Sequence, residues 1–308
     1  MSDFKKIAVL MGGTSNEREV SLSSGRNVAD ALESLGRYEV LRVVLDADDL
    51  SALPINVDAC YVALHGGWGE NGGVQAALDA RGIPYTGPGA AASRLAMDKI
   101  ATKRRLDQAG VPTAPWAIVA DPSAACPLPA PCVVKPPMDG SSVGISRVMS
   151  EVEWPAALKL ALDTDLGYRR REGMPETPQA LVEDYIPGRE ATVGVLGGDV
   201  LPAIEICVPG GWYGYEEKYN SNETRYVFPQ DAFVPEMQQL AKRAYDACGC
   251  RGVTRVDFRV TPEGGIYVLE LNTSPGMTGH SLVPKAAAEA GIPFPALCAR
   301  ILEAAAHD

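Results

Sequence analysis

The sequence predicts a protein of mixed α/β and α+β class, in which an N-terminal parallel α/β domain is followed by antiparallel sheets. Strand-like and helix-like segments alternate over residues 1–98, and this alternation is typical of a parallel sheet covered by helices. Beyond that point, short apolar runs separated by glycine turns indicate antiparallel strands. The chain of 308 residues is long enough for two domains or three smaller ones.

The elements of the first domain follow one another in a regular order. Strands are predicted at residues 6–13, 38–46, 57–66 and 83–87, and helices at residues 15–36 and 73–82. Asn16 and Glu19 have the spacing of a capping box at the start of the first helix, and Gly36 is a typical stop signal. This order of strands and helices supports a parallel sheet.

The pattern changes in the rest of the chain. A helical stretch is predicted at residues 91–110, and residues 130–148 read as strand, glycine-serine loop and strand. Residues 179–208 read as strands joined by glycine turns, whereas residues 167–178 have no apolar period and predict an exposed loop. Residues 209–229 lack a period but hold four tyrosines and a tryptophan, so we expect a compact loop that covers a site.

Composition and charge argue against several classes of function. The net charge of −11 argues against nucleic acid as a partner, because that role needs a basic face. No apolar run approaches the length of a membrane helix, and the N-terminal run is too short for a signal peptide. Cysteine spacings that match neither a zinc site nor a redox pair favour a reducing cytoplasm, and three histidines argue against a histidine-based metal site.

Two acids are predicted to face each other near the end of the chain. If residues 252–272 form a hairpin with a two-residue turn, Asp257 lies opposite Glu270 and Arg255 lies opposite Asn272. Facing carboxylates destabilise a sheet unless something offsets their charge. Carboxylate and amide oxygens suit Mg²⁺, so we favour a metal site. In the alternative reading, both acids face water and Arg255 is a salt-bridge partner.

A second group of residues has the character of a phosphate site. Lys135 ends a strand and is followed by the small residues Gly140, Ser141, Ser142 and Gly144, whose backbone N–H groups can approach phosphate oxygens. An ordinary surface hairpin with a chance lysine is the alternative. The stretch "GPGAAA" matches a dinucleotide fingerprint only loosely, and the sequence contains no Walker A motif.

Taken together, the motifs resemble those of the D-alanine–D-alanine ligase family, within the ATP-grasp superfamily. The resemblance extends from residue 5 to about residue 303 and rests on these stretches: "GGTSNEREVSLSSG", "ALHGGWGENGGVQ", "YTGPGAAASRLAMDK", "LVEDYIPGREATVGVL", "YEEKY" and "LELNTSPGMTGHSLVP". It implies a three-domain ATP-grasp fold that clasps ATP. The expected parts are an N-terminal α/β substrate-binding domain at 1–98, a central subdomain at 99–184 and a C-terminal metal-binding catalytic domain at 185–308.

The resemblance also implies an activity. Members of the family join two D-alanine molecules with ATP, through an acyl phosphate, for peptidoglycan synthesis and hence for cell-wall biogenesis and cell shape. A cytoplasmic homodimer is expected, with no nucleic-acid or membrane partner. A D-alanine–D-lactate or D-alanine–D-serine ligase is the nearest alternative, although Tyr219 in "YEEKY" resembles the dipeptide type. A dinucleotide-dependent oxidoreductase and a non-catalytic sensor are the alternatives from other classes.

Particular residues acquire roles through this resemblance. Two Mg²⁺ ions, with Mn²⁺ as a possible replacement, are expected at Asp257, Glu270 and Asn272. Phosphate contacts are expected from Lys99, Lys135, Ser142 and Lys218, an adenine contact from Glu183 and ribose contacts from Glu190. The ammonium group of the first D-alanine is expected at Glu17, beside His65.

The remaining roles concern the second D-alanine and the loop. Arg255 and the Gly276 N–H are expected to stabilise the oxyanion, and Ser281 with Arg255 to hold the second carboxylate, next to Leu282. Ser141, Tyr219 and Glu17 are expected to link the tyrosine-rich loop to the site.

Some of these residues have structural alternatives. Glu17 lies in a first helical turn, where the helix dipole favours an acid; His65 could be a hydrogen-bonded structural histidine; and Ser281 could cap a helix.

The chain also departs from the family pattern. Asn71 stands where aspartate is usual, Pro137 and Met138 stand where polar residues are common, and residues 167–178 look like a longer insertion.

Overall fold

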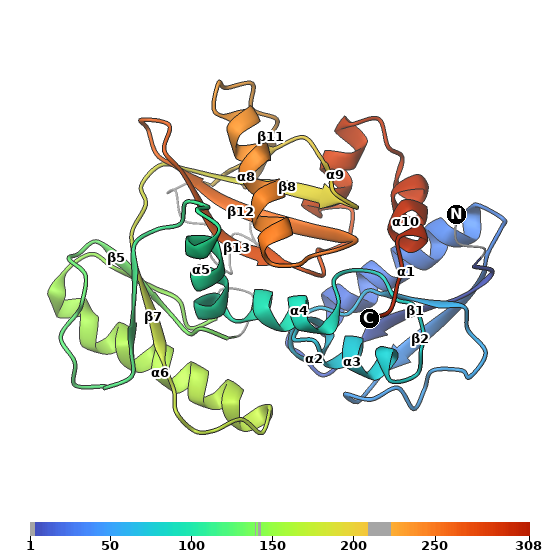
Figure 1. The fold of residues 1–308 in the computed structure, drawn as a ribbon, viewed down its shortest axis with the longest axis horizontal. Helices are drawn as coiled ribbons and strands as arrows, with labels where there is room; N and C mark the ends of the chain where they lie inside the picture. Colours follow the sequence, from blue (N-terminus) through green and yellow to red (C-terminus); the bar gives the residue numbers. More distant parts are fainter. Residues whose placement is uncertain (1–3, 139, 141–142, 209–222) are drawn as a thin grey trace.

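Three β-sheets organise the chain in this computed structural model, which describes residues 4–138, 140, 143–208 and 223–308. Figure 1 shows the N-terminal sheet in blue, the central sheet in green and the C-terminal sheet in yellow and orange, with both termini near the N-terminal sheet. The predicted mixed α/β and α+β class is confirmed, because a parallel sheet is followed by two antiparallel ones. The predicted domain boundaries at residues 98 and 184 stay a prediction.

The N-terminal sheet is parallel and has the strand order β2-β1-β3. Its elements are β1 (Lys6–Gly12), α1 (Arg18–Ser34), β2 (Glu39–Leu45), β3 (Ala59–Val62), α2 (Gly67–Glu70) and α3 (Gly73–Asp79). After Lys6, β1 is apolar, and residues 7–12 are buried because both faces of the strand are covered. The strand predicted at residues 83–87 is wrong, since only Tyr85 forms bridges, to Cys60 and Ala306.

The predicted capping box at Asn16 and Glu19 is also wrong. Glu17 occupies the N-cap position of α1, and no side-chain hydrogen bond caps this helix. Ser15 is turned elsewhere: its hydroxyl donates to the His65 carbonyl oxygen at 2.5 Å and accepts from the Glu17 N–H at 3.2 Å. The first turn of α1 is therefore tied to the loop after β3, which draws the chain toward the carboxyl end of the sheet.

The single helix predicted at residues 91–110 is divided in two at Asp98. α4 (Ala90–Met97) ends there because Asp98 has an extended ψ of 102°, and α5 (Lys99–Gln108) begins with the Asp98 side chain accepting from the Ala101 N–H at 3.0 Å. The break places Lys99 at the first residue of α5. Its backbone N–H donates to the Pro137 carbonyl oxygen at 2.9 Å, so α5 begins against the central sheet.

The central sheet is antiparallel, with the order β4-β7-β5-β6. Its strands are β4 (Trp116–Val119), β5 (Cys132–Lys135), β6 (Ser146–Val148) and β7 (Ala180–Asp184). One face is covered by α6 (Trp154–Arg171), which follows the short helix η1 (Glu151–Glu153). The exposed loop predicted at residues 167–178 is partly wrong, because α6 continues to Arg171 and buries Tyr168, which is 2% exposed.

The C-terminal sheet has the path β11-β10-β8-β12-β13, with β9 paired to β8. Its strands are β8 (Arg189–Leu196), β9 (Asp199–Val200), β10 (Ile204–Cys207), β11 (Arg225–Val227), β12 (Val253–Val260) and β13 (Ile266–Asn272). α8 (Val234–Ala247) packs on one face, and α9 (Leu282–Glu289) and α10 (Phe294–Glu303) belong to the core shared with β1 and α1. The end of the chain thus joins the C-terminal sheet to the N-terminal one.

The hairpin of β12 and β13 has the predicted register at the site but not the predicted turn. Asp257 pairs with Glu270 and Arg255 with Asn272, whereas Phe258 pairs with Val268. The Thr261 N–H donates to the Gly265 carbonyl oxygen at 2.8 Å, so the turn consists of residues 262–264. It is therefore one residue longer than the two-residue turn that we expected. The extra residue in β13 at position 269 restores the pairing of the acids.

The cysteines and the lengths of the helices were two further features considered in the sequence. The seven cysteines are free thiols; Cys60 and Cys132 are buried in their strands, whereas Cys207 is only partly buried. In the part of the chain that the structure describes, we find no helix with the length and apolar character needed to cross a bilayer.

Asp98→Ala removes the side-chain acceptor at the start of α5. We expect the free energy of unfolding to fall by about 1 kcal/mol, whereas Asp98→Asn keeps an acceptor oxygen and should cost only about 0.3 kcal/mol. Urea unfolding followed by circular dichroism compares the variants with the wild type. Equal stability of the Ala and Asn variants would contradict a capping role for Asp98.

Candidate active site

Residues from the N-terminal, central and C-terminal parts of the chain lie close together at one site. Lys99 of α5 lies 3.8 Å from Glu270 of β13, measured from Nζ to Oε2. On the N-terminal side, a Cβ placed on Gly140 would lie 3.5 Å from Glu17 Oε2, so the loop after β5 approaches the start of α1. The structure therefore brings together residues that the sequence predicted separately. Four predicted residues, Ser141, Ser142, Lys218 and Tyr219, lie outside the described residues.

Asp257 accepts hydrogen bonds from three neighbouring side chains. Its Oδ1 accepts from Arg255 Nε at 2.9 Å and from Thr192 Oγ1 at 2.6 Å, while its Oδ2 accepts from Arg255 Nη2 and Asn272 Nδ2, both at 2.9 Å. The carboxylate is 8% exposed, so it does not simply face water. The salt bridge to Arg255 from the alternative reading is present, and it offsets the charge of the facing acids together with Lys99.

The donor set on this face fits a hard cation. Asp257, Glu270 and Asn272 offer carboxylate and amide oxygens from adjacent positions of two paired strands. Among the described residues, no group of three or more His, Cys, Asp and Glu side chains forms a metal site by itself. A cation held here by only two carboxylates and an amide would need further oxygen ligands, as phosphates provide.

A buried ion-pair cluster lies beside this face, on the central sheet. Glu183 of β7 is 2% exposed and forms ion pairs with both Lys103 of α5 and Lys135 of β5. Burial alone would raise the pKa of Glu183, but the two lysines outweigh burial and hold it at about 2. Both lysines form ion pairs with the Glu183 carboxylate in this structure, so a contact between Glu183 and adenine stays a prediction.

Lys135 keeps its charge although it is only 7% exposed. Burial lowers the pKa of Lys135, but Glu183, and more weakly Glu270 and Glu190, outweigh burial and raise it. Glu190 of β8 pairs with Arg259 of β12, with 3.3 Å between Oε2 and Nη1. Lys135 thus faces acids of the C-terminal sheet from the central sheet, which is where a polyphosphate would need its cations.

Lys103 is a residue that the sequence reading missed. It is 1% exposed, and its Nζ donates to Thr113 Oγ1 at 2.5 Å as well as pairing with Glu183. The spacing of Lys99 and Lys103 was an available signal, because residues four apart lie on the same face of a helix.

Glu17 does not act as a helix cap. Its carboxylate lies against the loop after β3, where a Cβ on Gly66 would come within 2.7 Å of Glu17 Oε2. Gly66 also has a φ of 64°, so this position requires glycine on two grounds. The carboxylate thus lies between the loop after β3 and the loop that contains Gly140, while the position of Glu17 at the start of α1 remains compatible with the helix-dipole alternative.

His65 has both ring nitrogens engaged by the protein. Nδ1 lies 3.0 Å from the Ser274 carbonyl oxygen, and Nε2 lies 2.9 Å from Ser24 Oγ. Since a carbonyl only accepts, Nδ1 carries the proton and Nε2 accepts from the Ser24 hydroxyl. Burial lowers the pKa of His65, although Glu17 opposes this, so the ring is neutral. This geometry favours the structural reading of His65.

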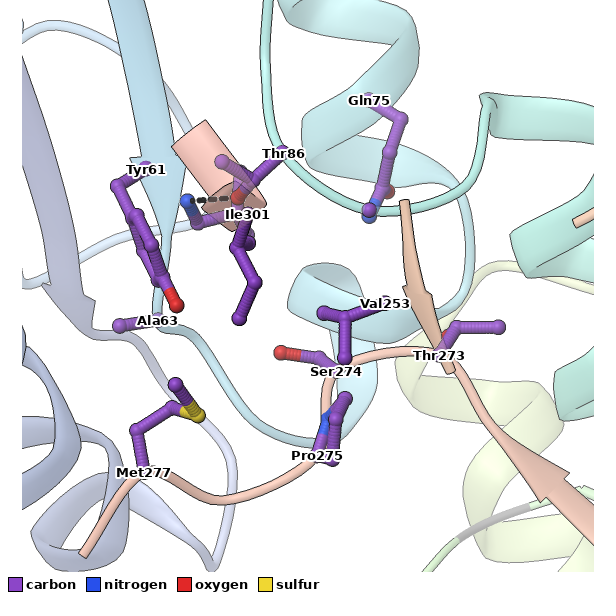
Figure 2. Close-up of a pocket in the computed structure, with 12 residues that line it drawn as sticks. Tyr61, Ala63, Gln75, Thr86, Val253, Thr273, Ser274, Pro275, Met277 and Ile301 are labelled. Atoms are coloured by element: carbon purple, nitrogen blue, oxygen red, sulfur yellow. Dashed lines mark hydrogen bonds between the residues drawn. The ribbon is translucent and has the colours of Figure 1, made fainter. Parts of the chain in front are cut away.

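The loop after β13 is held by this network. Ser24 Oγ accepts from the Met277 N–H at 3.1 Å, and the Ser274 hydroxyl donates to the Leu64 carbonyl oxygen at 2.7 Å. Figure 2 shows Ser274, Pro275 and Met277 beside Ala63 at the end of β3, around a small cavity of about 20 Å³. The backbone around Gly276 is therefore fixed from both sides.

Ser281 faces this loop rather than its own helix. It occupies the N-cap position of α9, yet it makes no side-chain cap hydrogen bond. Its Oγ instead accepts from the Thr278 N–H at 2.9 Å. A Cβ on Gly276 would lie 2.7 Å from Ser281 Oγ, so the two predicted residues are close neighbours, and Leu282 follows as a buried residue of α9.

Glu70 is a second residue that the sequence reading missed. Burial, Glu17 and Glu270 raise the pKa of Glu70, the Gly66 N–H and Arg255 lower it, and the net value is about 8. Glu70 therefore takes up a proton more readily than an ordinary glutamate, because of its burial and of charges on other elements. The available signal was its place between His65 and Asn71, in a glycine-rich turn at the carboxyl end of a parallel strand.

Known proteins resemble this chain over its whole length. A family model described as D-ala D-ala ligase C-terminus matches residues 106–303. A D-alanine–D-alanine ligase of Syntrophotalea carbinolica is 45% identical over 98% of this chain and 96% of that protein. The corresponding ligase of Bordetella pertussis is 43% identical, with the same shares covered.

Solved structures agree with these relatives. The D-alanine–D-alanine ligase of Bacillus anthracis superposes with a TM-score of 0.85 at 32% identity, and its complex with ATP with a TM-score of 0.82 at 29% identity. Each match covers 97% of both chains. On sequence and structure alike, the chain belongs to the D-alanine–D-alanine ligase family, with the ATP-grasp fold.

Proposed function

We propose that this chain is an ATP-dependent ligase that joins two D-alanine molecules into D-alanyl-D-alanine for peptidoglycan synthesis. The observation that carries the proposal is the pairing of Asp257 with Glu270 across β12 and β13, with Lys99 3.8 Å from Glu270 and with the Glu270 charge also acting on Lys135. The family relationship supports it, and so does the ATP complex of the Bacillus anthracis ligase. The proposal also includes the predicted cytoplasmic homodimer and the domain boundaries at residues 98 and 184.

The nucleotide would lie between the central and C-terminal sheets. Lys99 and Lys135 would contact its phosphates, and Glu183 and Glu190 would face adenine and ribose. Mg²⁺, or Mn²⁺ in its place, would be held by Asp257, Glu270 and Asn272 and would neutralise phosphate charge. Phosphoryl transfer depends mainly on positioning and on this neutralisation. Lysines that stay charged within a cluster of acids are suited to that task.

The first substrate would bind beside the N-terminal sheet, where Glu17 lies near Gly66 and Gly140. The Glu17 carboxylate would hold the ammonium group of the first D-alanine and leave its carboxylate to attack the γ-phosphorus. That attack forms the acyl C–O–P link and releases ADP. Because His65 is neutral and has both nitrogens engaged, we assign it to holding the loop rather than to binding substrate.

The second substrate would attack the acyl phosphate with its free amine and expel phosphate. The Gly276 N–H and Arg255 would stabilise the tetrahedral oxyanion, where losing one donor typically costs about 3 kcal/mol. Ser281 with Arg255 would hold the second carboxylate, beside Leu282. The fixed backbone on both sides of Gly276 suits this role, since an oxyanion donor must be in place before charge develops.

Lys103 serves this site indirectly. Its charge neutralises Glu183, which leaves the charge of Lys135 available for a phosphate. The folded pKa of Glu183, about 2, lies below its ordinary 4.5. The ionised carboxylate therefore stabilises the fold above about pH 4.5, and this contribution is lost as the pH falls toward 2.

The activity is tested by phosphate release from ATP and Mg²⁺ with D-alanine as substrate and L-alanine as control. We expect release with D-alanine only and a D-alanyl-D-alanine product in the mass spectrum. A depsipeptide formed with D-lactate in preference to the dipeptide would favour the D-lactate ligase. A protein that binds ATP and D-alanine but releases no phosphate would support the sensor reading instead.

Lys103→Met leaves Glu183 buried with one cation fewer. We expect the free energy of unfolding at pH 7 to fall by about 3 kcal/mol, because a buried carboxylate loses a partner. The difference from the wild type should narrow as the pH falls from 4.5 toward 2, since Glu183 then takes up a proton in both proteins.

Lys159→Met is the matched control for this measurement. Lys159 forms an exposed i,i+4 pair with Asp163, so its loss should cost no more than about 0.5 kcal/mol at any pH. Urea unfolding at a series of pH values gives both comparisons. Equal losses for the two variants at pH 7 would show that Lys103 does not stabilise Glu183.

A further inference from the structure

Three features that set this chain apart from the usual family pattern meet at one place in the fold. Asn71 ends α2, Met138 lies three residues after Lys135, and the segment 167–178 begins in the last turn of α6. They are distant in the sequence, yet the end of α6 lies beside α2 (Figure 1). None of them belongs to the proposed catalytic roles.

The contact between α2 and the end of α6 has a polar half and an apolar half. The polar half is a hydrogen bond between the N-terminal and central parts of the chain. Asn71 Nδ2 donates to Glu172 Oε2 at 2.8 Å and lies 3.4 Å from the Tyr168 hydroxyl oxygen. Asn71 Oδ1 accepts from the Gly73 N–H at 3.0 Å, so the amide orientation is fixed by its own turn. Asn71 thus presents a donor, and only a donor, to the carboxylate of Glu172.

The apolar half is a small separate core. It consists of Met97, Met138 and Tyr168, which are 8%, 6% and 2% exposed, with Met174 packed against them. Met97 lies two residues before Lys99, and Met138 lies three residues after Lys135. The Lys99 N–H also donates to the Pro137 carbonyl oxygen at 2.9 Å. Both phosphate-binding lysines are therefore attached, through short stretches of backbone, to the same cluster.

We propose that Asn71 and Glu172 are positioning residues for nucleotide binding. Their hydrogen bond holds the end of α6 against α2. The cluster of Met97, Met138 and Tyr168 connects the end of α6 to the backbone near Lys99 and Lys135, and so fixes where these two lysines lie. Both lysines are then kept facing Glu270 of the C-terminal sheet. The inference rests on the proposed function, because it assigns these lysines to the phosphates of ATP.

The chemistry of the pair makes the proposal specific. A carboxylate in place of the Asn71 amide would face Glu172 at hydrogen-bond distance, and two acids so close repel each other. The amide at position 71 therefore matches the acid at position 172.

The test exchanges the amide and the acid between the two positions. Asn71→Asp introduces the repulsion, so we expect the KM for ATP and the Kd for ADP to rise about tenfold, the size of one lost hydrogen bond. The kcat at saturating ATP should change by less than about twofold, because the chemistry is untouched. The double variant Asn71→Asp with Glu172→Gln restores an amide facing an acid and should return both constants to within about twofold of the wild type.

A matched control and a milder variant complete the experiment. Glu176→Gln lies in the same segment, is exposed and pairs with Arg170, so both constants should stay at the wild-type values. Glu172→Ala removes the acceptor without repulsion and should raise both constants by a smaller factor, about threefold, even if the Asn71→Asp protein folds poorly.

The outcomes separate this inference from the proposed function. Failure of the double variant to recover, or an unchanged Kd for ADP in Asn71→Asp and Glu172→Ala, would overturn the positioning role. A wild type that binds ADP but forms no dipeptide would contradict the proposed function, while the Kd values for ADP measured by calorimetry would still decide this inference.

Discussion

Asp257 and Glu270 lie directly opposite each other on β12 and β13, and two facing carboxylates persist in a sheet only when cations offset them. The structure supplies these cations from three directions. Arg255 comes from the same strand as Asp257, Lys99 from the start of α5, and Lys135 faces Glu270 from the central sheet. The parts of the chain around the central and C-terminal sheets therefore carry charges that offset one another.

The N-terminal part contributes by fixing backbone rather than by adding charge alone. Neutral His65 and the buried Ser24 hold the loop on both sides of Gly276, while Glu17 lies against the turn at Gly66. The central part contributes through Glu183, whose two lysine partners keep it ionised although it is buried. Rigid donors beside a balanced cluster of charges are suited to phosphoryl and acyl transfer, in which positioning and neutralisation do most of the work.

Much of this arrangement could be predicted from the sequence, because its signals are local. Periodicity indicated the strands of the first domain, and the pairing of Asp257 with Glu270 followed from counting across a hairpin. That pairing was correct although the turn was wrong, since the extra loop residue and the bulge at position 269 cancel. The break at Asp98, the burial of Tyr168 and the partners of Lys103 depend on tertiary contacts. Glu70 escaped notice because its raised pKa comes from its burial and from charges on other elements.

The face formed by Asp257, Glu270 and Asn272 is expected to hold divalent cations together with nucleotide phosphates, and the proposed chemistry depends on this. The most direct test is a Mn²⁺ titration followed by electron paramagnetic resonance, with and without ADP, on the wild type and on Glu270→Gln. Glu263→Gln, an exposed position in the turn of the same hairpin, is the control. We expect ADP-dependent Mn²⁺ binding that Glu270→Gln weakens at least about tenfold and Glu263→Gln leaves unchanged. Equal Mn²⁺ affinity in all three proteins would contradict a metal site on this face.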